Sequence, residues 1–481
     1  MDHFRQFIAG EFADAASGSV LDVYEPATGQ VYGRVAAGDR ADVDRAVDAA
    51  RSAFPAWANT PADHRAAVLN RIADGIESHL DALARAESVD TGKPISLASS
   101  VDIPRAVANM RFFAGSLMHF ASEAHAMEDR GFNYTLRQPL GAVGCISPWN
   151  LPLYLFTWKI APALAVGNTV VAKPSEITPA TATLFCEIAL DAGLPDGVLN
   201  VVHGEGPSAG EALISHRHVK AISFTGSTAT GRHIAEVAGP TFRKLSLEMG
   251  GKNPTIVFAD YDRDADLDTI VRSGFANQGQ ICLCGSRILV QESIYAEFRD
   301  AFVERVKALR PGDPLEPGTQ QGALVSEAHM NKVLGCIERA REEGGRILCG
   351  GGRVRLQGRC ADGWFVEPTV IEGLYAQTRT NQEEIFGPVV TLMPFKDEKD
   401  AVSQANATKY GLAASLWTSD LKRAHRVARN LETGILWVNC WMMRDLRTPF
   451  GGVKQSGVGR EGGLEALRFF TEPKNVCIDL Q

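Results

Sequence analysis

Cys282 is the residue of this sequence whose type and surroundings most directly suggest chemistry. It lies in the segment GQICLCGSR at 279–287, where flanking glycines would let a substrate carbonyl approach the sulfur closely. The thiolate is the reactive form of cysteine, so a nucleophile here must be able to lose its proton. Cys282 and Cys284 have no second Cys/His pair at ligand spacing, so we expect no metal. Taken alone, the segment fits a buried structural cysteine better than a nucleophile.

Two other side chains could assist a nucleophile. Glu248 lies between apolar residues and a glycine pair, in LEMGGK, where burial would raise its pKa toward that of a working general base. An ion pair with Lys252 or Lys244 is the alternative, and the segment alone favours it. Asn150, in SPWN, has an amide N–H that could donate to an oxyanion. An Asx turn would also explain an asparagine there.

Three segments could bind a dinucleotide. Residues 204–209 have the Rossmann spacing with alanine in third place, and residues 224–227, followed by Gly231, also lead from a strand into a helix. The N–H groups and dipole of such a helix favour a pyrophosphate. Lys173 could hold ribose hydroxyls, and Glu176 could accept from a 2′-OH and repel a 2′-phosphate, which favours NAD over NADP. The alternative is that all three are turns at a sheet edge.

The composition limits what kind of protein can carry these residues. The 481 residues hold 49 Lys+Arg and 57 Asp+Glu, a net charge of −8, which argues against nucleic acid as a partner. Nine cysteines are too sparse for a secreted disulfide framework, and we see no signal pattern, so we expect a cytoplasmic protein. Residues 138–158 carry no charge, but three prolines argue against a membrane helix. We predict a buried strand followed by a polar loop.

The order of elements predicts an α/β fold with a parallel sheet. Residues 1–35 resemble short strands, and 39–128 are mostly helical, with Asp39 or Asp42 as a helix cap. From residue 140, short apolar runs alternate with helices, the pattern of βαβ units. The predicted strands are 142–146, 169–172, 199–202, 221–224, 255–257 and 288–290, with a last strand at 475–480.

These motifs together resemble those of the aldehyde dehydrogenase superfamily over essentially the whole chain. The motifs are PWN at 148–150, KPSE at 173–176, FTGS at 224–227, LEMGGK at 247–252, GQICLCGSR at 279–287, EEIFGP at 383–388 and PFGGVKQSGVGRE at 449–461. The resemblance implies that Cys282 is the catalytic thiol and Glu248 the base, which overturns both local alternatives. It also implies an oxyanion hole formed by Asn150 and the Cys282 N–H, and a proton path through Lys159 and Glu461.

The same resemblance implies NAD as the cofactor. Lys173, Glu176 and Ser227 match contacts to the adenosine ribose and pyrophosphate, and Glu384 and Phe386 match contacts near the nicotinamide ribose. The pyrophosphate would then lie at the FTGS turn rather than at residues 204–209. The full expected set is Ser147, Trp149, Lys173, Ser175, Glu176, Gly206, Gly226, Ser227, Glu384 and Phe386.

The substrate is expected to carry a carboxylate. In the family, the segments around Arg105 and Arg444 line the substrate tunnel, and guanidinium groups bind carboxylates bidentately. The alternatives are a solvated helix face for Arg105 and a local pair with Asp445 for Arg444. Trp158, Trp441 and Phe450 would form apolar walls.

Residues DIPR at 102–105 and NCWMMRDLRTPFGG at 439–452 resemble the 2-hydroxymuconic and 2-aminomuconic 6-semialdehyde dehydrogenases of aromatic degradation. The 5-carboxymethyl-2-hydroxymuconate semialdehyde dehydrogenases, a broader-specificity aldehyde dehydrogenase, a CoA-acylating enzyme and an inactive structural descendant are the alternatives. The presence of Cys282, Glu248 and Asn150 argues against the last.

The implied architecture has three parts. A Rossmann-like NAD-binding domain comprises residues 1–118 and 135–247, an α/β catalytic domain comprises 248–440, and a small β-flap for oligomerisation comprises 119–134 and 460–481. The strand at 475–480 has no obvious partner within its own flap. Because family members pair it across subunits, we expect a homodimer or a homotetramer.

Overall fold

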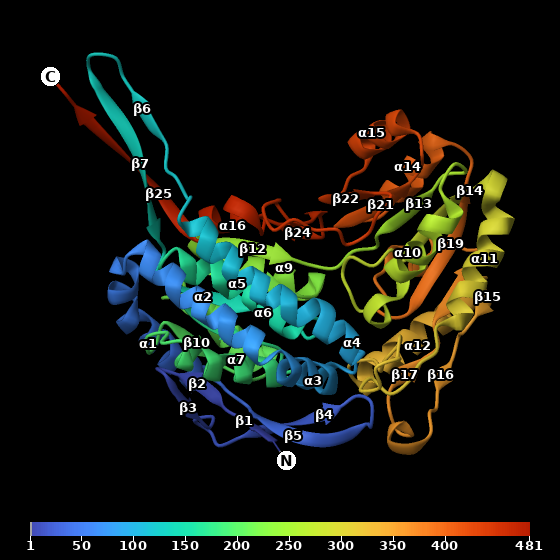
Figure 1. Cartoon of the computed structure of the whole chain (residues 1–481), viewed down its shortest axis with the longest axis horizontal. Coiled ribbons are helices and arrows are strands. Elements are labelled where there is room, and N and C mark those ends of the chain that lie inside the picture. The colour runs from blue at the N-terminus through green and yellow to red at the C-terminus, as the bar shows by residue number, and fades with distance from the viewer. Residues whose placement is uncertain (1) are drawn as a thin grey trace.

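The computed structural model describes residues 2–481. Its two largest β-sheets, of eight and seven strands, form the centres of two neighbouring parts of the molecule (Figure 1). The five inner strands of the first sheet are parallel, and antiparallel strands flank them on both sides. In order across the sheet, the strands are β24 (Gly457–Val458), β12 (Lys244–Glu248), β11 (Ala221–Thr225), β8 (Ala142–Ile146), β9 (Thr169–Lys173), β10 (Leu199–Val201), β2 (Gln6–Ile8) and β3 (Glu11–Ala13).

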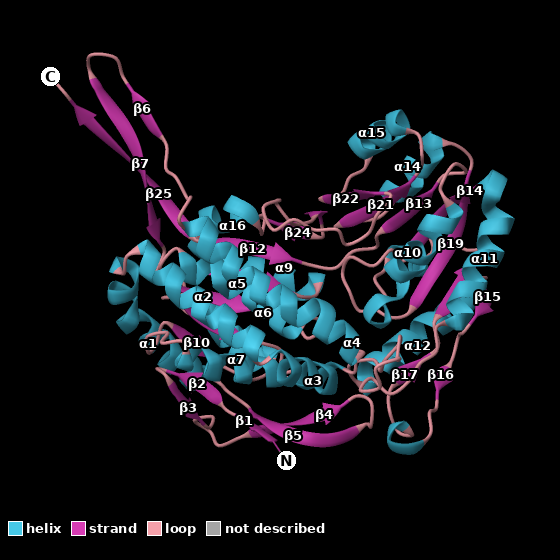
Figure 2. Ribbon diagram, viewed as in Figure 1, coloured by secondary structure: helices cyan, strands magenta, loops and turns pink. Residues whose placement is uncertain are grey.

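Helices cover both faces of this first sheet (Figure 2). Along β9, Val170 and Ala172 join one apolar core while Val171 joins another, as alternating side chains of a doubly covered strand must. Helix α6 (Pro152–Ala165) packs on β8 and β9 and is covered by α5 (Ile103–Leu117) and α2 (Ala62–Ser78). Helix α1 (Arg40–Asn59) packs on β8, β9 and β10 and begins with a capping box at Asp39, one of the two predicted caps.

The second sheet lies beside the first and is parallel except for one edge strand. In order across the sheet, its strands are β15 (Arg346–Cys349), β18 (Thr369–Glu372), β19 (Val389–Phe395), β14 (Arg287–Gln291), β13 (Pro254–Val257), β21 (Ala413–Trp417) and β22 (Ile435–Val438). The predicted strands of the βαβ pattern are therefore confirmed, most of them within one or two residues at each end.

The uncharged segment 138–158 is only partly as predicted. The strand β8 is followed by a loop, but α6 then starts at Pro152 and all 14 of its residues are buried. A helix buried on every side has no polar face, so its sequence lacks the periodicity that would reveal it. No helix within residues 2–481 is long and apolar enough to cross a membrane.

A three-stranded sheet projects from the body near the C-terminus (Figure 1). Its strands are β6 (Ala124–Ala126), β7 (Gly131–Pro139) and β25 (Thr471–Asp479). The expectation that the tail strand has no obvious partner within its own flap is wrong, because β25 pairs with β7 over nine residues. The first residues of β7 lie inside the expected flap at 119–134, and the strand continues from there to Pro139. The outer edge of β25 pairs with no strand of the described chain.

Candidate active site

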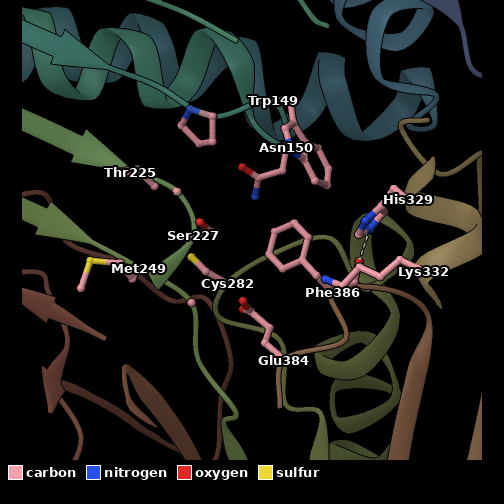
Figure 3. A pocket seen from close by; sticks show the side chains of 13 residues that line it. Trp149, Asn150, Thr225, Ser227, Met249, Cys282, His329, Lys332, Glu384 and Phe386 are labelled. Atoms are coloured by element: carbon pink, nitrogen blue, oxygen red, sulfur yellow. Dashed lines mark hydrogen bonds between the residues drawn. The ribbon is translucent and has the colours of Figure 1, made fainter. Parts of the chain in front are cut away.

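A cavity of about 260 Å³ lies between the two sheets, at the carboxyl ends of β8 and β11 (Figure 3). Because parallel strands end at the same edge, the PWN and FTGS turns that follow β8 and β11 are brought together there. The second sheet contributes the Cys282 segment, and the EEIFGP loop closes the cavity. It is lined by Pro148, Trp149, Asn150, Thr225, Gly226, Ser227, Met249, Gly250, Cys282, His329, Lys332, Glu384 and Phe386.

An unusual turn carries Cys282 into the cavity. Asn277, Gln278 and Gly279 have φ of 50°, 55° and 69°, a left-handed run that is costly for residues other than glycine. A Cβ at Gly279 would lie 2.0 Å from the Gly387 carbonyl oxygen, so only glycine fits there. The Asn253 amide donates to the Cys282 carbonyl at 2.7 Å, which fixes the turn from the other side. Such strain is typical of sites where geometry has a function.

The surroundings of the Cys282 thiol raise its pKa and so favour the protonated form. Burial raises its pKa well above the usual value, and the carboxyl groups of Glu384 and Glu248 raise it further, whereas Arg444 acts in the opposite direction. A nucleophilic Cys282 therefore needs a group that removes its proton. Cys284 is buried, and burial raises its pKa to about 12, which suits a structural residue.

Asn150 lines the same cavity as Cys282. Its Nδ2 donates to the Gln280 carbonyl at 2.9 Å, and its own carbonyl accepts from Asn277 Nδ2 at 3.1 Å. Figure 3 shows the side chains of Asn150 and Cys282 directed into the same space. The partners in these two hydrogen bonds are 130 and 127 residues apart in the sequence, so a local Asx turn does not explain the position of Asn150.

Glu248 lies at the end of β12 and only 3% of its surface is exposed. The described residues offer neither of its carboxylate oxygens a hydrogen-bond partner, and it does not line the cavity. The predicted alternative of an ion pair is wrong, because Lys252 has no partner and Lys244 binds Glu472 at 3.3 Å. Burial, and then the charge of Glu461, raise the pKa of Glu248 well above its usual value.

Lys159 and Glu461 form a buried ion pair near Glu248. The Lys159 Nζ lies 2.7 Å from Glu461 Oε1, and the Ser223 hydroxyl donates to the same oxygen at 3.1 Å. Lys159 also donates to the Ser223 oxygen at 3.2 Å. The sequence indicated the first two residues as a proton path but not Ser223, which lies inside β11 and carries no motif signal.

Three aromatic rings form the opposite wall of the cavity. The Trp149 and Phe386 centroids lie 5.3 Å apart, and His329 lies 5.2 Å from Trp149. The His329 Nε2 is 2.7 Å from the Phe386 carbonyl oxygen, and burial lowers its pKa to about 4, so the neutral ring donates this bond. His329 and Lys332 were missed, since they come from α12 (Glu327–Glu342), whose only sequence signal is the Ser326 cap.

Glu384 reaches the cavity because two glycines let it approach. Its Oε1 accepts from the Gly251 N–H at 3.0 Å, and a Cβ at Gly250 would lie 2.0 Å from its Oε2. Burial raises the pKa of Glu384 to about 7. Lys173 and Glu176 lie further away and bind each other at 3.1 Å. Neither they nor Ser147, Ser175 and Gly206 line the described cavity.

The predicted substrate residues do not line this cavity, and both arginines contact aromatic rings. The Arg444 guanidinium lies 4.1 Å from the Phe450 ring centre and 5.4 Å from that of Trp158, while Arg105 lies 5.6 Å from the Tyr154 ring. The Trp441 Nε1 donates to the carbonyl of Leu283, the residue after Cys282, at 3.1 Å.

This geometry excludes the local alternatives for both arginines, a pair with Asp445 for Arg444 and a solvated helix face for Arg105. The local pair of Arg444 with Asp445 is wrong, because Asp445 binds Arg447 and Arg444 donates to the Tyr154 hydroxyl. Arg105 is half-buried against Tyr154 rather than on a fully solvated helix face. Tyr154 was not predicted as a site residue.

Comparison with known proteins identifies the family to which this sequence belongs. The sequence matches the model of the "Aldehyde dehydrogenase family" over residues 12–476. It is 50% identical over 477 residues to a 2-aminomuconic semialdehyde dehydrogenase of Mus musculus, with 98% of each chain covered. It is 48% identical over 486 residues to a 2-hydroxymuconic semialdehyde dehydrogenase of Pseudomonas sp. (strain CF600), with 100% of each covered.

A solved structure has the same fold. PnpE from Pseudomonas sp. WBC-3, solved in complex with nicotinamide adenine dinucleotide, superposes with a TM-score of 0.97 at 42% identity. The match covers 99% of this chain and 98% of that one. The predicted fold class is therefore confirmed.

Proposed function

Because this chain belongs to the aldehyde dehydrogenase family, we propose that it oxidises a carboxylated semialdehyde, 2-hydroxymuconic or 2-aminomuconic 6-semialdehyde, to the dicarboxylic acid with NAD. The observation that carries the substrate class is the meeting of Arg105 and Arg444 at one tyrosine beside the Cys282 segment. Guanidinium groups in a half-buried apolar setting suit a carboxylate. The names of the relatives fit the same substrate class.

The nicotinamide end of the dinucleotide would lie in this cavity, toward Cys282. Thr225 lines the cavity, and its Oγ1 is buried without a hydrogen-bond partner among the described residues, so it is free for a ligand. The Trp149 and Phe386 rings form an apolar wall. Ser227 caps helix α9 (Thr228–Ala238), whose N-terminal amides favour a pyrophosphate. NAD, when bound, accepts the hydride.

The chain's own residues supply the remaining chemistry. Once Glu248, whose charge acts on the thiol, has accepted its proton, the Cys282 thiolate attacks the aldehyde carbon. The oxyanion of the resulting thiohemiacetal accepts from the Asn150 amide and the Cys282 N–H. On comparable sites, losing one such donor costs about 3–4 kcal/mol. After hydride loss, the thioester is hydrolysed by water that Glu248 deprotonates. Lys159 and Glu461, paired at 2.7 Å, can carry that proton away.

Steady-state kinetics on two aldehydes tests the proposal. The variants Arg105→Ala and Arg444→Ala should raise KM for a muconic semialdehyde far more than for a neutral aldehyde of similar length. Arg447→Ala is a matched control, since its arginine is exposed and bound to Asp445. Equal effects of the two substitutions on both aldehydes would refute carboxylate recognition. Including the 5-carboxymethyl substrate in the panel decides between the two substrate branches.

The expected assembly is part of the same proposal. The outer edge of β25 offers unpaired backbone groups over nine residues, and such an edge favours pairing with another strand. A homodimer or homotetramer built through this edge would cover it. Light scattering of the intact chain, and of a variant with proline in place of Val476, measures the assembly directly.

A further inference from the structure

Tyr154 lies where the two proposed substrate arginines meet. It is on the first turn of α6, and only 2% of its surface is exposed. Arg444 Nη1 donates to its hydroxyl, and the guanidinium carbons of Arg105 and Arg444 lie 5.6 Å and 6.0 Å from its ring centre. One side chain therefore contacts both cations, which come from segments 339 positions apart in the sequence.

The backbone around Tyr154 is held from two sides. Its carbonyl accepts from the Asn109 Nδ2 at 3.0 Å, and Asn109 lies one turn after Arg105 on α5. The preceding N–H, of Leu153, donates to Glu87 at 3.3 Å. Lys93 in turn binds Glu87 at 3.3 Å in a fully buried ion pair. The tyrosine is thus fixed relative to the helix that carries Arg105.

The chemistry of a phenol suits this position. Two guanidinium groups repel each other, and an aromatic face within about 6 Å attracts each of them. The hydroxyl oxygen accepts from Arg444, so its own hydrogen remains to be donated. Within residues 2–481 the structure gives that hydrogen no acceptor. A carboxylate held by the arginines would be such an acceptor.

We propose that Tyr154 is a specificity-determining residue, whose ring keeps the two arginines together and whose hydroxyl is a third donor to the substrate carboxylate. The inference rests on the proposed function, since it requires a carboxylated substrate. It adds a residue that no motif indicates and that a neutral aldehyde would not use.

The variant Tyr154→Phe isolates the hydroxyl, because the ring and its cation contacts remain. We expect KM for the muconic semialdehyde to rise about tenfold or more, as for loss of a hydrogen bond to a charged group. KM for a neutral aldehyde should change far less. Tyr295→Phe is the matched control, since its hydroxyl also binds a carboxylate, that of Glu372 at 3.0 Å, but lies away from the site. It should leave both KM values unchanged.

A binding measurement makes the test independent of turnover. On a Cys282→Ala background, Tyr154→Phe should weaken binding of a muconic dicarboxylate, measured by calorimetry, by a similar factor. A tyrosine that serves packing alone would lower Tm and leave the ratio of the two KM values unchanged, which would overturn the inference. If the arginine variants are selective and Tyr154→Phe is not, the inference fails and the proposed function stands. If none is selective, both fail.

Discussion

Glu461→Gln should move the pH profile of thioester hydrolysis in a direction that the structure determines. Glu248 must be deprotonated to act as a base, and burial together with the charge of Glu461 raises its pKa. Removing the negative charge of Glu461 removes one of these causes, so the pKa of Glu248 should fall. The acidic limb of the profile should then shift to lower pH.

The size of this shift follows from Coulomb's law. With an effective dielectric constant of about 20, a neighbouring buried unit charge contributes on the order of 1 kcal/mol or more, and one pKa unit is about 1.4 kcal/mol. The expected shift is therefore about one pH unit. Lys159→Met should act in the opposite direction, because the ammonium group of Lys159 lowers the pKa of Glu248.

The assay must observe deacylation itself. Acyl-enzyme formed in a single turnover is quenched at intervals and quantified by mass spectrometry over a range of pH. Ser223→Ala serves as a control, because it removes a hydrogen bond to Glu461 at 3.1 Å without changing the charge. Shifts of Glu461→Gln and Lys159→Met in the same direction would refute the electrostatic reasoning, as would a Glu461→Gln profile that matches the unsubstituted enzyme.

Three further outcomes follow from the geometry. Asn150→Ala should lower kcat about 10²–10³-fold with little change in NAD binding, measured by steady-state kinetics and NAD titration; an unchanged kcat would exclude it from the oxyanion hole. Gly250→Ala should raise KM for NAD, because the added Cβ would lie 2.0 Å from Glu384 Oε2, and a normal KM would show that Glu384 is not needed there. Lys93→Met should reduce the free energy of unfolding by about 3–5 kcal/mol, measured by denaturant titration, because it leaves buried carboxyl groups without their cation; a loss below 1 kcal/mol would contradict this.

Much of the site could be predicted because motif residues sit at the ends of predictable strands. Strands β8, β9 and β11 have short, largely apolar sequences, and their carboxyl ends must share one edge of a parallel sheet. Asn150 follows β8, and Ser227 follows β11, so the shared edge of the sheet brings both residues to one place. The cavity contains both, together with Cys282.

The residues that sequence reasoning missed come from packing between distant segments. Tyr154 belongs to a helix buried on all sides, where an aromatic residue is indistinguishable from core by pattern. His329 reaches the cavity only because α12 is carried there by the second sheet. The pairing of β25 with β7 depends on contacts more than 330 residues apart, which no local pattern records.

The net charge of the whole chain does not favour an anionic substrate. The net charge is −8, and the cavity itself contains Glu384 near the thiol. An anionic substrate therefore gains nothing from the overall field, and recognition must come from local cations in a setting of low dielectric. Arg444 has a second effect there, since its charge also lowers the pKa of Cys282. A carboxylate that neutralises Arg444 would make the thiol harder to ionise, so deprotonation of Cys282 should precede, rather than follow, full engagement of the substrate carboxylate.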